Sequence, residues 1–232
     1  MWRGNIEKQI LFEDRQILVC HKPAGLAVQS ARVGTADMES LLKNYLAKKE
    51  PGKIPYLGVV HRLDQPVEGV LLFARTPKAA RDLSAQIAGG QMKKLYLAVT
   101  GRCPSAPEGT LEDYLKKDGR TNTSAVVPKG TEGAKKARLS YRVEQVLPGE
   151  EPGTDRCLVR IRLETGRHHQ IRVQMAHAGM PLLGDQKYGN AKVGDAALAL
   201  CADCLTFMYP GTKKEKTFRV EPEGAAFQKF LK

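Results

Sequence analysis

Short runs of alternating apolar and polar residues recur along the chain, and many of them follow one another with no helical segment in between. In 157–164, four apolar residues share one face of an extended strand, while Arg160, Arg162 and Glu164 share the other. The run 139–146 alternates in the same way. Strands in direct succession are typical of hairpins, so the sequence predicts an α+β fold whose central sheet is mainly antiparallel or mixed and flanked by helices, and not doubly wound and parallel.

Four segments have the periodicity or the boundary residues of a helix. The first is expected to begin near Thr35, its predicted N-cap, and to end before Pro51. The second follows Thr76, with a proline at the first helical position. Two more are expected, one after Gly166 and one over 225–232. Further strands are predicted at 10–20, 66–75, 96–100, 198–207 and 216–220, and basic hairpins and loops at 101–138.

The charge of the chain indicates the class of its partner. Its 232 residues are 42% hydrophobic and 27% charged, a composition typical of one globular domain or two small ones. Lys and Arg number 37 against 25 Asp and Glu, a formal net charge of +12. This excess favours a polyanion, with nucleic acid first and an anionic membrane surface second. No run approaches the roughly 18 apolar residues of a membrane span, and no signal-peptide stretch opens the chain, so we expect a cytoplasmic protein.

The five cysteines predict no disulfide framework, because their number is odd and only Cys201 and Cys204 lie close together. This CxxC pair is half of a common zinc site, but no second CxxC or CxxH completes it. Both residues lie in an apolar run and are expected to be buried thiols. The fingerprints of nucleotide-binding loops, GxSxG hydrolases and HExxH metalloproteases are absent from the sequence.

A polar loop, HRLDQP at 61–66, leads into the strand expected at 66–75. On a loop anchored by a strand, Asp64 is a candidate nucleophile or base, and Arg62 a candidate for binding a substrate phosphate. The alternative is a surface turn in which Asp64 fixes the loop by hydrogen bonds. The spacing alone leaves both interpretations open.

Two more segments gather groups that suit an anionic substrate. In 164–175, two arginines and two histidines surround an expected helix N-terminus, where cations are unfavourable unless an anion also binds. Arg172 lies there at the margin of the core, and the alternative is a solvated basic helix edge. Tyr96 follows two lysines at the start of a strand, an arrangement in which a ring stacks on a base. The alternative for Tyr96 is an ordinary amphipathic strand residue.

Four blocks of the chain stand in the order and spacing of a known family's motifs. They are KPAGL at 22–26; HRLD at 61–64 with GVLLFAR at 69–75; KLYLAVTG at 94–101; and TGRHHQIRV at 165–173 with GDQKYG at 184–189. In this order they resemble the RluA-type family of RNA pseudouridine synthases. The resemblance extends over nearly the whole chain, from about residue 10 to about residue 207.

The chain departs from that family's pattern in two places. After the motif's aspartate the family usually has a Thr-Ser-Gly-like triplet, whereas here Val67 and Glu68 precede the glycine. Gln174 stands where a histidine is common. Neither departure removes a group assigned to chemistry, but Glu68 alters the groups available to contact RNA. We expect a single pseudouridine synthase catalytic domain over 1–232, without the small S4-like domain that many relatives carry in front.

The resemblance implies isomerisation of specific uridines in structured RNA, either rRNA or tRNA, to pseudouridine. The bond from N1 to C1′ breaks, the uracil turns, and C5 bonds to C1′, which requires a carboxylate and a pocket for the extracted base. The family's reaction uses no metal, redox cofactor or ATP. The implied partner is therefore the RNA substrate, and we expect a monomer with no obligatory protein partner.

The resemblance also assigns roles to single residues. Asp64 is the expected catalytic carboxylate. Arg172 is expected to pair with Asp64, and Tyr96 to stack on the target uracil. Substrate contacts are expected from five further residues: Arg62, His61, Arg167, His169 and Gln170.

Two other functions are compatible with these segments. A non-catalytic RNA-binding or assembly module has the same fold without the reaction, and the intact set of Asp64, Tyr96 and Arg172 argues against it. A hydrolase or phosphate-ester enzyme using Asp64 and the His168–His169 region predicts metal dependence or turnover of small substrates.

Overall fold

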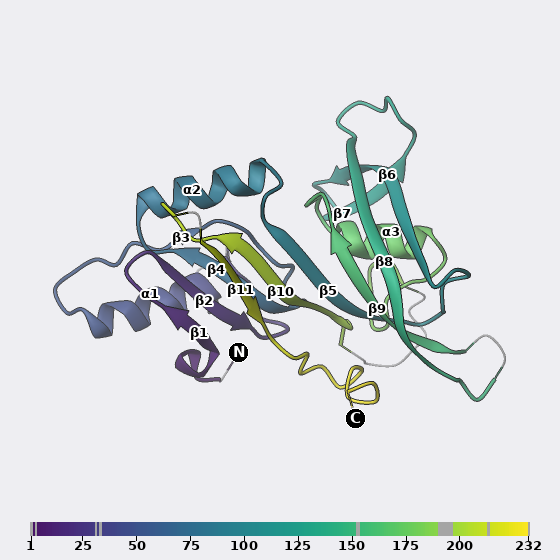
Figure 1. Ribbon diagram of the computed structural model, residues 1–232, viewed down its shortest axis with the longest axis horizontal. Helices are drawn as coiled ribbons and strands as arrows, with labels where there is room; N and C mark the ends of the chain where they lie inside the picture. Colours follow the sequence, from purple (N-terminus) through teal and green to yellow (C-terminus); the bar gives the residue numbers. More distant parts are fainter. Residues whose placement is uncertain are drawn as a thin grey trace. The chain divides into compact units, whose positions relative to one another are not determined.

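The structure is a computed structural model that describes residues 2, 4–30, 32, 34–151, 154–189, 197–212 and 214–231 (Figure 1). The chain divides into two compact units, Met1–Lys93 with Ala202–Glu221 and Lys94–Cys201 with Pro222–Lys232. That 1–232 forms a single catalytic domain remains a prediction. None of the described helices is long and apolar enough to cross a membrane.

The first unit is built on a sheet with the strand order β1-β2-β4-β10, in which β3 also pairs with β4 and β11 with β10. The strands are β1 (Ile10–Glu13), β2 (Ile17–Lys22), β3 (Gly58–Val59), β4 (Glu68–Ala74), β10 (Leu200–Met208) and β11 (Glu215–Arg219). All residues of β2 and β4 are buried, which explains their nearly continuous apolar sequence. The pairings of β1 with β2 and of β2 with β4 are antiparallel, as predicted.

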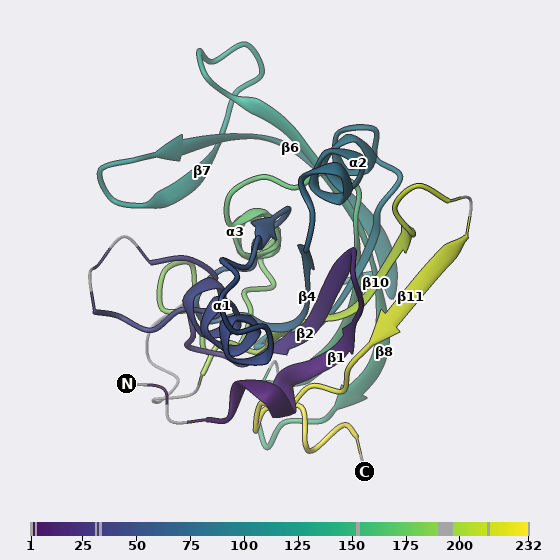
Figure 2. The ribbon, with the colours of Figure 1, turned by 90° about the vertical axis from the view of Figure 1, so that its left-hand side faces the viewer.

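Two α-helices accompany this sheet, α1 (Met38–Lys49) and α2 (Pro77–Ala88), after a short 3-10 helix, η1 (Ile6–Gln9). Helix α2 is capped by Thr76 as predicted and packs Leu83 into the core formed with β2 and β4. Helix α1 lies beside β1 and β2 (Figure 2). Its N-cap is Asp37 and not Thr35, because the Asp37 carboxylate accepts from the backbone of both Ser30 and Ser40, at 2.6 and 2.7 Å.

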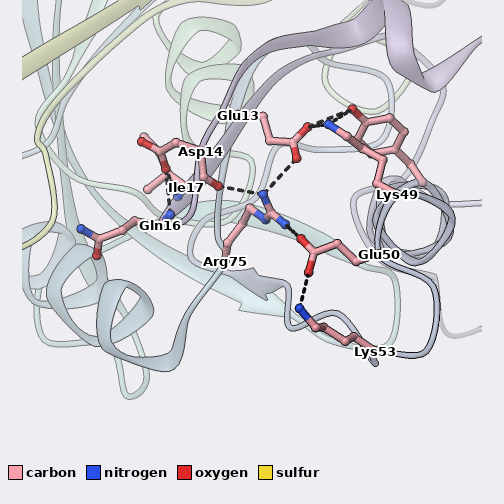
Figure 3. A network of polar contacts seen from close by, with 9 residues as sticks. Glu13, Asp14, Gln16, Ile17, Lys49, Glu50, Lys53 and Arg75 are labelled. Carbon is pink, nitrogen blue, oxygen red and sulfur yellow. Dashed lines mark hydrogen bonds and ion pairs between the residues drawn. The ribbon is translucent and has the colours of Figure 1, made fainter.

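Arg75, directly after β4, joins β1 to the end of α1 (Figure 3). Its guanidinium donates to Glu13 Oε1 at 2.9 Å, to the carbonyl of Asp14 at 2.8 Å and to Glu50 Oε1 at 3.1 Å. Lys49 completes the network through the other oxygen of Glu13, at 3.0 Å. These contacts explain the arginine that ends the GVLLFAR block, and they give it a structural role.

We expect Arg75→Met to lower the free energy of unfolding by about 2 kcal/mol, because it removes several hydrogen bonds between charged groups at a largely buried position. Urea denaturation measures this difference. A matched substitution of Lys53, whose exposed side chain forms a peripheral pair with Glu50, is expected to change stability by less than about 0.5 kcal/mol. Equal stability of the wild type and Arg75→Met contradicts the structural role.

The second unit contains a sheet with the strand order β5-β9-β8-β6-β7, in which each of these neighbouring strands pairs antiparallel with the next. The strands are β5 (Lys93–Thr100), β6 (Glu108–Asp118), β7 (Thr123–Val127), β8 (Lys135–Leu147) and β9 (Arg156–Leu163). The basic segment 101–138 therefore forms hairpins, as predicted. Helix α3 (Gln170–His177) lies against β6 and β7, with Val173 packed on Leu115 and Ala137 (Figure 1).

Two helix predictions need correction in this unit. Helix α3 begins at Gln170 and not directly after Gly166, because a turn closed by the Gln170 N–H on the Arg167 carbonyl precedes it, with His169 in the left-handed region at φ 54°. The predicted helix over 225–232 is wrong for its described part, where the backbone N–H groups of Phe227 and Phe230 bond three residues back in successive turns. The burial of these two aromatic rings, and not a helical period, explains the apolar pattern there.

The prediction of no disulfide framework also needs correction, because Cys103 and Cys157 form a disulfide. Cys157 is opposite Thr100 in the pairing of β9 with β5, and the chain after Thr100 brings Cys103 back to within 5.3 Å between Cα atoms. Their separation of 54 residues gives no local signal. Cys201 and Cys204 are buried in β10, as predicted.

Candidate active site

Asp64 lies on the loop that leads into β4, and the loop is braced against the KPAG turn. The backbone N–H of Val67 closes a turn on the carbonyl of Asp64 at 3.0 Å. Gln65 and Gly25 then exchange two hydrogen bonds: the Gly25 N–H donates to the Gln65 carbonyl at 2.9 Å, and the Gln65 amide donates to the Gly25 carbonyl at 3.0 Å. Two segments 40 residues apart in sequence therefore hold the position of the carboxylate together.

Lys22, at the end of β2, lies beneath this loop and is fully buried. Its ammonium group donates to three backbone carbonyls, those of Pro23 at 3.0 Å, Leu26 at 2.7 Å and Gln65 at 3.0 Å. Burial lowers its pKa to about 7, although the negative charge of Asp64 acts to raise it. Lys22 belongs to the KPAGL block that resembles a motif of the family, but that resemblance gave it no role. The structure shows that it fixes the residue next to Asp64.

We expect Lys22→Met to lower the free energy of unfolding by about 3 kcal/mol near pH 7, because it leaves three carbonyls without their donor. The difference in the free energy of unfolding between the wild type and Lys22→Met should widen at higher pH. Since burial lowers the folded-state pKa to about 7, the unfolded chain binds more protons at Lys22 between pH 7 and about 10.5. The stability of the wild type relative to the variant then rises with pH, by up to about 1.4 kcal/mol per unit. Urea titrations at pH 7 and 8.5 measure this, and a gap that narrows contradicts it.

His61 and Glu68 flank the loop in different ways. His61 Nε2 accepts a hydrogen bond from the backbone N–H of Leu72 at 3.0 Å, so His61 ties the loop to β4 and its substrate contact remains a prediction. Glu68, the departure from the family pattern, is buried and its carboxylate lies 3.9 Å from His21 Nε2. Arg62 is exposed, as a phosphate contact requires.

In the second unit, Arg172 has a carboxylate partner that the sequence analysis did not identify. Arg172 Nε and Nη2 donate to the two oxygens of Asp185 at 2.8 and 2.7 Å. Asp185 Oδ1 also accepts from the backbone N–H groups of Lys187 and Tyr188. Burial opposes ionisation of Asp185, but the hydrogen bonds and charge of Arg172 outweigh it and hold the pKa below its ordinary value. The pair fixes the direction of Arg172, whose expected pairing with Asp64 remains a prediction.

Tyr188 connects this ion pair to the two histidines that precede α3. Its hydroxyl accepts from the backbone N–H of Ser124 at 2.8 Å and lies 2.7 Å from His169 Nδ1. The ring of His168 stacks on that of His169 with centroids 3.7 Å apart. His168 contacts Ser124 Oγ and Asn122 Oδ1 through its two ring nitrogens. The network holds the β6–β7 turn against the N-terminal end of α3.

Gln170 is buried, and its amide contacts the protein's own groups. Its Oε1 accepts from the hydroxyl of Thr165 and from the backbone N–H of Arg167, at 2.8 and 3.0 Å. Its Nε2 donates to Gln174 Oε1 at 2.9 Å, and Gln174 donates to Asp113 on β6. Gln174, the second departure from the family pattern, therefore joins α3 to the sheet. A substrate contact by Gln170 remains a prediction.

The structure gathers four predicted residues at the N-terminal end of α3: Arg167, His169, Gln170 and Arg172. Tyr96 belongs to the same unit and is buried on β5, opposite Ile161 of β9. Sequence reasoning missed the partners Asp185, Tyr188 and Ser124. The first two lie in the GDQKYG block, whose two flanking glycines are the signal in the sequence. They mark a sharp turn, in which Gly184 has φ 74° and the Gly189 N–H donates to the Asp185 carbonyl.

The chain is similar to known proteins over most of its length. Residues 16–177 match the family described as RNA pseudouridylate synthase. An uncharacterized RNA pseudouridine synthase of Zymomonas mobilis is 37% identical over 188 residues, which cover 81% of each chain. Ribosomal large subunit pseudouridine synthase D of Xylella fastidiosa is 33% identical over 222 residues, which cover 89% of this chain and 63% of that protein.

The solved structure of human RNA pseudouridylate synthase domain containing 4 is similar with a TM-score of 0.76. The match covers 94% of this chain and 90% of the human one at 22% identity, so it supports the α+β fold alone. The family match spans well over half of the sequence and includes Asp64, Tyr96 and Arg172. The chain therefore belongs to the RNA pseudouridylate synthase family.

Proposed function

We propose that this protein isomerises specific uridines in RNA to pseudouridine, with Asp64 as the catalytic carboxylate. The observation that carries the proposal is the braced loop: in a chain of this family, Lys22 and the Gly25–Gln65 pair hold the motif's aspartate in place. Positions of catalytic groups need this precision, because small displacements are costly for rate. The proposal assigns the reaction to residues 1–232 acting as one catalytic domain.

In the proposed reaction the N1–C1′ bond of the target uridine breaks and a C5–C1′ bond forms. The hydrogen on C5 leaves to solvent, and N1 takes up a proton, so atoms and charge balance. Asp64 acts as nucleophile or base, and Tyr96 stacks on the uracil taken out of its helix. Arg172, fixed by Asp185, supplies a directed positive charge to the site. Arg62, His61, Arg167, His169 and Gln170 are assigned to RNA contact.

Large-subunit rRNA is the first substrate we propose, because relatives of the chain are named for the large ribosomal subunit, and tRNA is the second. The net charge of +12 supports RNA binding but carries no sequence information. We also propose that the enzyme is cytoplasmic and works as a monomer without an obligatory protein partner.

Release of tritium from transcripts labelled at uridine C5 tests the proposal, since formation of the C5–C1′ bond expels that hydrogen. We expect release from unmodified large-subunit rRNA in the presence of a chelator. No release from rRNA or tRNA, with folded protein that binds both, favours the non-catalytic module. Metal-dependent cleavage of the RNA or of a small phosphate ester, without release of tritium, favours the hydrolase.

A further inference from the structure

Two lysine doublets lie on neighbouring strands of the second unit, Lys116-Lys117 on β6 and Lys135-Lys136 on β8. Successive side chains of a strand point to opposite faces of a sheet. The registers of β6 with β7 and β8 have no bulge here, so each doublet places one lysine on each face.

Packing identifies the lysine of each doublet that lies on the α3 side. Lys117 is opposite Ser124 in the register of β6 with β7, and Ser124 contacts the residues beside α3. Lys135 precedes by two residues Ala137, which packs against Val173 of α3. Lys117 and Lys135 therefore share the face of α3, and their neighbours in the doublets lie on the outer face.

On the outer face, most cations are paired with glutamates. Lys136 and Arg138 contact the carboxylate of Glu112 at 2.8 and 3.4 Å. Arg138 also contacts Glu164 at 3.1 Å. Glu144 pairs with both Arg142 and Arg160, at 3.0 and 3.1 Å. A cation that a carboxylate already neutralises does little to neutralise a phosphate, so few of the counterions condensed on the RNA are released and this face contributes little to binding.

On the α3 side, four exposed cations lie around the N-terminal end of the helix: Lys117, Lys135, Arg167 and Lys187. Among the residues that the structure describes, none of the four forms an ion pair. Arg167 Nε and Lys187 Nζ bond only the backbone carbonyls of Lys136 and Asn122, which leaves their charges uncompensated. The carboxylates of this side, Asp113 and Asp185, accept from Gln174 and Arg172.

We propose that Lys117, Lys135, Arg167 and Lys187 form the surface that binds the RNA phosphate backbone, and that the outer face of the same strands stays out of the contact. We call these four residues the α3-side cations. The proposal rests on the proposed function for its partner. It also assigns the two lysines of each doublet, which the sequence does not distinguish, to different roles: one binds RNA and the other does not.

Two double variants with the same change in net charge test this surface: Lys117→Gln/Lys135→Gln on the α3 side and Lys136→Gln/Arg138→Gln, which removes two paired cations, on the outer face. The measurement is the dissociation constant for a large-subunit rRNA fragment as a function of salt. In the α3-side variant, the negative slope of the logarithm of the association constant against log salt should become shallower by about 1.4 to 1.8. Binding should weaken about tenfold near 0.15 M salt. The outer-face variant should keep the wild-type slope.

Equal losses in the two variants indicate a general charge effect and overturn the proposal, as does a loss confined to the outer face or no loss in either. Thermal melts of both variants exclude unfolding as the cause. The test is separable from the proposed function because it measures binding. A protein that binds RNA through the α3 side but releases no tritium keeps this proposal and loses the catalytic one.

Discussion

Asp64→Asn is expected to abolish pseudouridine formation, with a fall in the rate of tritium release of at least about 10³-fold. The substitution keeps the size of the side chain but replaces a carboxylate with an amide, which is neither a nucleophile nor a base at neutral pH. The loop should keep its shape, because the bonds that brace it come from Lys22, Gly25 and Gln65 and from the backbone of Asp64.

Two controls separate this chemical loss from a structural one. The stability of Asp64→Asn in urea should lie within about 1 kcal/mol of the wild type, and its RNA affinity should be unchanged. Gln65→Ala removes one of the bonds that brace the loop but keeps the carboxylate, so it should lower activity by about tenfold, far less than Asp64→Asn does. Full activity in Asp64→Asn means that the carboxylate is not catalytic.

Arg172→Ala is the second substitution with a large expected effect. It leaves Asp185 buried without its counter-charge, and breaking a buried pair in this way costs about 3–5 kcal/mol of stability. Arg172→Lys is the sharper variant, since it keeps the positive charge but cannot form the two-pronged contact with Asp185. We expect it to fold and to lose about 10²-fold in kcat, because a misdirected charge is costly for rate.

Asp185→Asn, which changes the other partner of the ion pair, should lower kcat by about as much as Arg172→Lys does. We assign Asp185 a positioning role, so its substitution should lower kcat while KM for RNA stays within about threefold. A double-mutant cycle of Arg172→Lys and Asp185→Asn should then show strongly non-additive losses. If the two losses in kcat add, Asp185 does not act through Arg172 and its role is structural only.

Local rules predicted those parts of the fold whose signals are local. The start of α2 is set by neighbouring residues, since Thr76 caps the helix by accepting from the Ala79 N–H and a proline follows it. The alternation in 157–164 likewise predicted a strand, and its register with β5 confirms it. The start of α1 shows the limit of such rules. Thr35 and Asp37 are both good caps, and the choice of Asp37 depends on its second bond, to Ser30, in a preceding loop.

The rest depended on contacts between residues far apart in the sequence. The bond between Cys103 and Cys157 exists because β5 and β9 pair, which no spacing of cysteines reveals. The partner of Arg172 was missed for a similar reason. Asp185 follows 13 residues later, beyond the end of α3 and a turn, and returns to the helix only when the chain folds.

The candidate site was predicted in part. The family motifs single out Asp64 and Arg172 as candidates, but not the side chains that hold them, because a supporting residue is recognised by its bonds. Lys22 illustrates this: a lysine in a turn is ordinarily exposed, and only its three carbonyl contacts reveal a buried brace.

Direct nucleoside analysis of RNA treated with the protein tests the central claim most closely. Unmodified large-subunit rRNA is incubated with wild type or Asp64→Asn in a chelator and without nucleotides, digested to nucleosides and separated by chromatography. The account predicts that wild type converts uridine to pseudouridine at a small, fixed number of positions per molecule and that Asp64→Asn yields none. Absence of pseudouridine from rRNA and tRNA alike, with folded wild-type protein bound to both, contradicts the claim that the protein is an RNA pseudouridine synthase.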